Sequence, residues 1–222
     1  MYRAILYKEW IKIRWAFAGF AAIVFAISVY IFFDVRHSIE FSGAIRNWVY
    51  IVNMKYIYYS ALKYIPFFGG ITIGVVQFIP EVLKRRMRLS FHLPVNGDLS
   101  LLFMVFIGLT ANLIIDVLLY ICLLTIGFTF YPLEIVISSL ITFLPWLLAG
   151  LAGYLACVMI VTEQSWLYRA LYIIIGYGFI SLLHLEKGYS EYSFSIWKYV
   201  VIVLLFCITI LFPGYRFRRG SK

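Results

Sequence analysis

The sequence predicts an all-α polytopic membrane protein with six transmembrane helices, and composition is the first support for this. Hydrophobic residues make up 64% of the 222 residues and charged residues 13%, whereas a soluble domain has about 45–50% apolar and about 25% charged residues. An aromatic content of 20% excludes a disordered chain. At about 20 apolar residues per span, the length allows roughly five to seven helices. We therefore expect residues 1–222 to form one transmembrane domain, with no soluble catalytic domain.

The N-terminal segment, residues 1–15, is expected to form an amphipathic helix at the membrane interface. Its apolar residues recur every three to four positions and its basic residues fall mainly between them, a pattern typical of interfacial helices. A plain cytoplasmic extension of the first span is the alternative. Span 1 is expected at about residues 16–33. The long segment 34–60 carries mixed charge and many aromatic residues, which predicts a loop or helix at headgroup level.

Span 2 is expected at about residues 62–80, and the polar segment 81–98 follows it. Gly70 and Gly74 stand in G-x-x-x-G register, which permits close helix packing. In the segment 81–98, basic and apolar residues alternate and Pro94 ends any helix. This mixture suits a groove on a cytosolic partner better than solvent. A positively charged loop without a partner is the alternative.

The remaining apolar runs predict four more spans. They lie at about residues 99–127, 133–162, 170–184 and 197–213. The first two are longer than about 20 residues, so these helices should be tilted or project from the bilayer.

The charge distribution predicts the orientation. With six spans both termini lie on one side, and that side holds thirteen of the nineteen basic residues. Because basic residues collect on the cytoplasmic side, we expect both termini in the cytoplasm. The net charge of +9 is therefore explained by orientation, without a nucleic-acid partner.

Motifs for catalysis, metal binding or nucleotide binding are missing from the sequence. There is no G-x-x-x-x-G-K-[ST], so the chain itself does not bind ATP through a P-loop. The three histidines are isolated, and the three cysteines lie in apolar runs without C-x-x-C spacing. We expect no catalytic, cofactor or metal site on this chain.

Polar residues within a span are rare, and Asn112 and Asp116 are the exceptions. They lie four residues apart on one face of the third span, where a carboxylate is costly and normally faces protein or water. Lys63 opens span 2 at a similar level, so we predict a Lys63–Asp116 ion pair that fixes packing. A substrate or proton role for Asp116, or snorkelling towards the interface, are the alternatives.

The order of these features resembles the membrane subunit of an ABC-2-type ABC transporter (the type V exporter fold). The matching pieces are YKEWIKIRW and FIPEVLKRRMRLSFHLPVNGDLSLLF. The resemblance implies that residues 1–15 form an "elbow" helix and that about Glu81–Leu93 form the coupling helix, which enters a cleft of the ATPase subunit. One difference is that residues 185–196 are brief, where family members often have a longer hairpin. The implied ATPase-coupling residues are Glu81, Lys84, Arg85, Arg86, Arg88, Phe91 and His92.

The function implied is that of a permease, an exporter subunit in a bacterial inner membrane. The implied partners are two copies of a cytosolic ATP-binding subunit, which hold ATP and Mg²⁺, and a second permease in a homodimer or heterodimer. Aromatic-rich spans and few buried charges would suit a lipidic, peptide-like or amphipathic substrate. The alternatives are a non-transporting subunit that anchors or regulates a larger complex, and a membrane-embedded enzyme.

Overall fold

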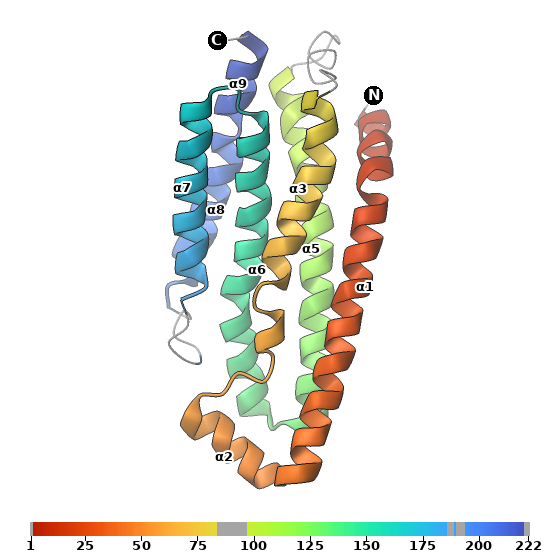
Figure 1. Cartoon of the computed structure of the whole chain (residues 1–222), viewed down its shortest axis with the longest axis vertical. Helices are drawn as coiled ribbons and strands as arrows, with labels where there is room; N and C mark the ends of the chain where they lie inside the picture. Colours follow the sequence, from red (N-terminus) through yellow and green to blue (C-terminus); the bar gives the residue numbers. More distant parts are fainter. Residues whose placement is uncertain (1, 84–96, 186–188, 190–193, 220–222) are drawn as a thin grey trace.

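All regular structure in the described part of this chain is helical. The computed structural model describes residues 2–83, 97–185, 189 and 194–219. The elements are α1 (Tyr2–Ser42), α2 (Ala44–Met54), the 3₁₀ turn η1 (Ser60–Leu62), α3 (Ile65–Leu83), α5 (Gly97–Phe130), α6 (Leu133–Thr162), α7 (Trp166–Leu183), α8 (Ile196–Thr209) and α9 (Leu211–Arg219). Figure 1 shows an elongated bundle, with the first and last described residues at the same end.

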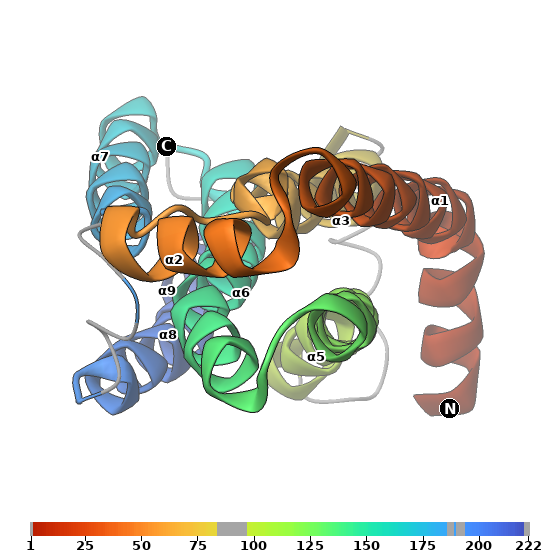
Figure 2. The same ribbon diagram turned by 90° about the horizontal axis from the view of Figure 1, so that it is seen from below.

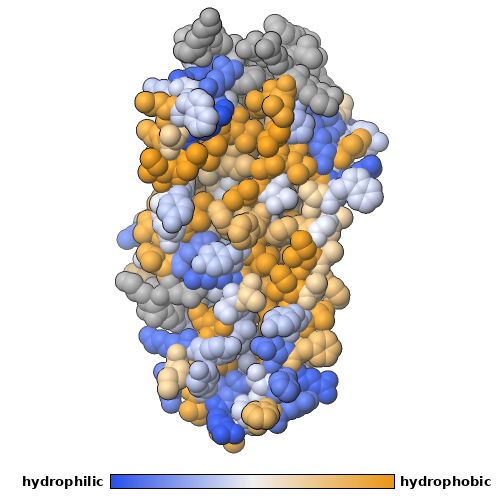
Figure 3. Space-filling model, in the orientation of Figure 1, coloured by the Kyte–Doolittle hydropathy of each residue, from blue (hydrophilic) through white to orange (hydrophobic). Residues whose placement is uncertain are grey.

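Six of these helical segments are long and apolar enough to cross a membrane, as predicted. Apolar side chains dominate the middle of the face in Figure 3, and hydrophilic ones gather at the lower end, where α2 lies. Many large apolar residues on the helices are exposed, which is costly in water and ordinary in lipid. The chain is therefore an integral membrane protein.

Helix α1 begins at Tyr2 and runs without interruption through 41 residues. A separate elbow helix is not shown, because residues 2–15 form the first turns of the same helix that contains the first span. An unbroken helix of this kind matches the alternative given above, in which the N-terminal segment is an extension of span 1. The helix ends at Gly43, whose φ of 82° turns the chain sharply into α2.

Helix α2 lies across the end of the bundle, nearly perpendicular to the long helices (Figure 2). It buries Asn47 and Ile51 and exposes apolar residues such as Val49 and Val52. The indole N–H of Trp48 donates to the Phe130 carbonyl at the end of α5, 3.3 Å away. The expected interfacial segment therefore contains an amphipathic helix attached to the ends of α1 and α5.

Helices α3 and α6 form the most extensive contact in the bundle. A Cβ built on Gly70 would lie 2.1 Å from the Gly150 carbonyl oxygen, and one built on Gly150 would lie 2.8 Å from the Pro66 carbonyl. A Cβ on Gly74 would meet Cys157 at 3.1 Å. The two backbones touch because glycine has no side chain, so the predicted close packing at Gly70 and Gly74 is confirmed.

The span boundaries agree with the prediction to within about a turn except at the first span, where α1 continues to Ser42 and the expected end was near residue 33. Helix α6 has the predicted bounds of 133–162, whereas α5 is longer at both ends and α7 begins four residues earlier, at Trp166. The last span is divided into α8 and α9 at Ile210. Proline 80 does not end α3, which continues to Leu83.

Candidate functional site

Four charged side chains meet where α1 packs against the last turns of α3. The Lys12 ammonium lies 2.5 Å from Glu81 Oε1 and 2.6 Å from Glu9 Oε1. The Lys8 ammonium lies 2.9 Å from Glu81 Oε1 and 3.8 Å from Glu9 Oε1. Each cation thus faces both carboxylates, and the α1–α3 contact at this end is ionic.

This cluster continues into α5 and α6 through neutral polar groups. Gln77, one turn before Glu81 on α3, donates to Glu9 Oε2 over 3.2 Å and to the Met104 carbonyl of α5 over 2.8 Å. Tyr154 of α6 donates its hydroxyl to Gln77 Oε1 over 2.9 Å. The network of Lys8, Glu9, Lys12, Gln77, Glu81 and Tyr154 is called the charged network below. It joins four helices: α1, α3, α5 and α6.

Burial makes the charged network energetically important. Glu9, Glu81, Gln77 and Tyr154 are fully buried, and the Lys12 side chain is 13% exposed. Lys8 is 39% exposed and connects the network to the surface. Two cations balance two carboxylates, which lowers the cost of removing them from water. Removing one partner would leave a buried charge without compensation.

The charged network is suited to holding helices together. Both carboxylates are engaged with cations or hydrogen-bond donors from other turns or helices. Within the described ranges, no group of His, Cys, Asp or Glu could hold a metal ion. Since Glu81 is three residues before Lys84, the network lies where α3 leaves the bundle.

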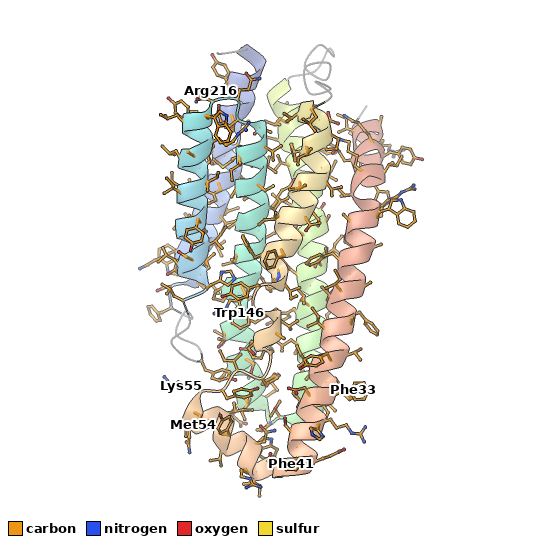
Figure 4. All side chains as sticks on the ribbon, in the orientation of Figure 1. Phe33, Phe41, Met54, Lys55, Trp146 and Arg216 are labelled. Atoms are coloured by element: carbon orange, nitrogen blue, oxygen red, sulfur yellow. The ribbon has the colours of Figure 1, made fainter. Side chains whose placement is uncertain are left out.

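A second charged contact lies at the same end, between α6, α7 and α9. Glu163 follows α6, is buried, and accepts at Oε1 from the backbone N–H groups of Gln164 and Ser165. The Arg216 guanidinium lies 3.6 Å from Glu163 Oε2 and 3.7 Å from the centre of the Tyr168 ring. Figure 4 shows Arg216 at this end of the bundle. This contact attaches the C-terminal helix to the α6–α7 link.

The predicted pair between Lys63 and Asp116 does not form, which corrects that expectation. The Lys63 ammonium lies 5.4 Å from the centre of the Tyr64 ring. Asp116 is buried near the middle of α5, and no described residue makes an ion pair with it. Asn112 is also buried and donates its amide to the Gly108 carbonyl, 2.9 Å away. Counting along a helix gives a level in the bilayer but not the direction in which a side chain points.

Most of the expected ATPase-coupling residues lie outside the described residues. These are Lys84, Arg85, Arg86, Arg88, Phe91 and His92. Glu81 is described, and it is buried against Lys8 and Lys12 instead of lying on a docking surface. The described contacts of its side chain are therefore internal to the chain.

Sequence reasoning missed Glu9, Gln77 and Glu163, and it underestimated buried charge. Gln77 and Glu81 are four residues apart, so they share one face of α3. This is the same spacing that drew attention to Asn112 and Asp116. The spacing of four between Gln77 and Glu81 therefore indicates a polar face on α3. Lys8 and Lys12 are also four residues apart, so α1 offers a basic face that could have been matched to it.

The opposite end of the bundle holds a cluster of tyrosines. The rings of Tyr58 and Tyr131 lie 4.6 Å apart, and the Tyr189 hydroxyl donates to the Tyr56 carbonyl over 2.7 Å. Burial raises the pKa of Tyr58 to about 12 and raises the pKa of Tyr131 as well. Buried, neutral aromatic rings therefore make up much of the packing among these tyrosines.

Comparison of the chain with protein-family models, with curated proteins and with solved structures found no match.

Proposed function

We propose that this chain is the permease subunit of an ATP-driven exporter of the ABC-2 type, in a bacterial inner membrane with both termini in the cytoplasm. ATP and Mg²⁺ would bind to a separate cytosolic subunit, present in two copies. The segment of about Glu81–Leu93, called the docking segment below, would enter a cleft of that subunit. A second copy of this chain, or a similar chain, would complete the transport pathway.

The charged network is the observation that carries the proposal. A docking segment can drive a membrane span only if the two are joined rigidly. Glu81 is the first residue of the docking segment and is held by Lys12 at 2.5 Å and Lys8 at 2.9 Å. Gln77 then connects the same helix to α5 and α6. A displacement where α3 leaves the bundle would therefore be transmitted to three other helices.

The packed interior supports a pathway formed between two copies. Trp146, Phe143 and Tyr59 fill the centre of the bundle, and their rings contact one another. Figure 4 shows Trp146 in this central region. These rings occupy the interior of one bundle, whereas the α8 segment is mostly exposed and free to face lipid or a second subunit.

The positions of described charges support the orientation. Lys8, Lys12, Arg169 and Arg216 lie at the end of the bundle that holds both termini. The segment 84–96, which joins α3 to α5 at this end, adds four more basic residues. The positive-inside rule places such an end in the cytoplasm.

The test is whether an ATPase binds through the docking segment, about Glu81–Leu93. The tagged chain is expressed in its own host and purified in mild detergent, and co-purifying chains are identified and assayed for ATP hydrolysis. Arg85, Arg86 and Arg88 are then all replaced by Glu. The control replaces three basic residues at the opposite end by Glu: Arg36, Arg46 and Lys55.

We expect a P-loop ATPase to co-purify with the wild type and the control, and to be lost from the first variant. Equal ATPase recovery with both variants would contradict docking through this segment. If an unrelated membrane complex co-purifies with all three chains, the chain is instead an anchoring subunit.

A further inference from the structure

A groove between α5 and α6 contains a buried carboxyl group. Its volume is about 330 Å³, within the range of small-molecule sites. Leucines 144, 147, 148 and 151 of α6 form one wall, and Asp116 and Tyr120 lie on the α5 wall. Among the described residues that line this groove, Asp116 is the one carboxylic acid.

Asp116 lacks a partner of its own. The residue is 6% exposed, and its Oδ2 atom has no hydrogen-bond donor among the described residues. The amide of Asn112, one turn away, is turned to the Gly108 carbonyl. No Lys or Arg within the described ranges reaches Asp116 or lines its groove.

This arrangement contrasts with the charged network at the end of the bundle. There, Glu9 and Glu81 are balanced by two lysines from the same chain. Asp116 lies near the middle of α5, where a carboxylate without a counter-charge is most costly. A lipophilic cation bound beside Asp116 would stabilise the ionised form of this carboxyl group, and the leucine wall would favour an apolar body on that cation.

We propose that the α5–α6 groove is a binding site for lipophilic organic cations, with Asp116 as the anionic anchor. The cation would reach the groove from the membrane, because exposed apolar residues such as Leu113, Val117 and Ile121 line its rim. A partly dry site strengthens attraction between opposite charges. That such cations are transported rests on the proposed exporter function, whereas their binding does not.

The test measures equilibrium binding of radiolabelled tetraphenylphosphonium to the purified chain in phosphatidylcholine nanodiscs. The variants are Asp116→Asn, which removes the charge, and Asp116→Glu, which keeps it. Glu134→Gln is the matched control, because it removes an exposed carboxylate that lines a different groove. Tetraphenylborate, similar in size and shape but negatively charged, is the control ligand. Thermal unfolding and size-exclusion chromatography establish that each variant is folded.

We expect Asp116→Asn to weaken tetraphenylphosphonium binding by about tenfold or more, the factor typical of losing a contact to a charged group. Asp116→Glu and Glu134→Gln should bind within about twofold of the wild type, a difference well below the energy of one such contact. Tetraphenylborate binding should not depend on residue 116. If Asp116→Asn does not fold, the test rests on the wild type alone, which should bind tetraphenylphosphonium more tightly than tetraphenylborate.

Equal tetraphenylphosphonium binding by folded wild type and Asp116→Asn would overturn the proposal. So would a wild type that binds the two ions alike, or an Asp116→Asn variant whose sole change is weaker self-association. The last result would mean that a second copy covers the groove. The binding assay contains no ATPase, so its outcome is independent of the proposed exporter function. If cations bind here and the co-purification experiment recovers no ATPase, the exporter is refuted and this site still stands.

Discussion

Breaking the Lys12–Glu81 pair should destabilise the protein more than any other single change at this end of the bundle. The proposed perturbation is Lys12→Met, which keeps the length of the apolar stem and removes the ammonium. Glu81, fully buried, would lose its contact at 2.5 Å, and Glu9 would lose one at 2.6 Å.

The magnitude follows from burial. Removing one partner of a buried ion pair typically costs about 3–5 kcal/mol, because the other charge stays buried. Lys8 remains near both carboxylates and compensates in part, so we expect a loss of about 3 kcal/mol from Lys12→Met. The control is Lys8→Met. Lys8 is 39% exposed, and solvent screening should limit its loss to about 1 kcal/mol or less.

The assay is reversible unfolding in mixed micelles, followed by circular dichroism, for Lys12→Met, Glu81→Gln and the double variant. Because both changes remove one interaction, the double variant should lose less than the sum of the two singles, by roughly 1–3 kcal/mol. The reasoning would be refuted if Lys12→Met cost no more than Lys8→Met. Additive losses in the double variant would refute it as well.

Three further predictions use the same unfolding assay. Gly70→Ala should lower the free energy of unfolding by about 1–3 kcal/mol, because its Cβ would lie 2.1 Å from a backbone oxygen. The control is Gly178→Ala, whose Cβ would have nothing within 4 Å, so this change should be neutral or stabilising. Equal losses in the two variants would contradict the packing argument. Tyr154→Phe should cost about 1–3 kcal/mol, because a buried amide oxygen loses its donor; an unchanged midpoint would exclude the hydroxyl from the network. Arg216→Gln should cost about 1 kcal/mol or less at low salt, and the difference should shrink at about 1 M NaCl, where exposed charges are screened. A salt-independent loss would contradict an ionic role for Arg216.

The spans were predictable because hydrophobic length is a local property. The run from Leu133 to Thr162 has no charge beyond Glu134, and the helix has the same bounds. The pair Gly70 and Gly74 was similarly readable, since its spacing places both glycines on one face. What the spacing could not give was the partner helix, α6, because that depends on packing between distant parts of the chain.

The candidate site was less predictable because burial of a charge depends on its neighbours. From the sequence we expect Glu81 in the coupling helix, and nothing in the sequence singles out Glu9. The structure buries both, since Lys12 from one helix reaches carboxylates of two. The predicted pair of Lys63 and Asp116 was wrong for the opposite reason. Their positions in the sequence suggested a similar depth in the membrane, but the two side chains do not meet.

The subunit composition of the native complex tests the proposed function most directly. The chain, extracted from its own membrane with a lipid-preserving polymer, is weighed by native mass spectrometry and assayed for ATP hydrolysis. The account predicts an assembly with two permease chains, each of 25.9 kDa if both are this chain, together with two P-loop ATPase subunits, and hydrolysis in the eluate. The chain alone, or an assembly without an ATP-binding subunit and without hydrolysis, would contradict it.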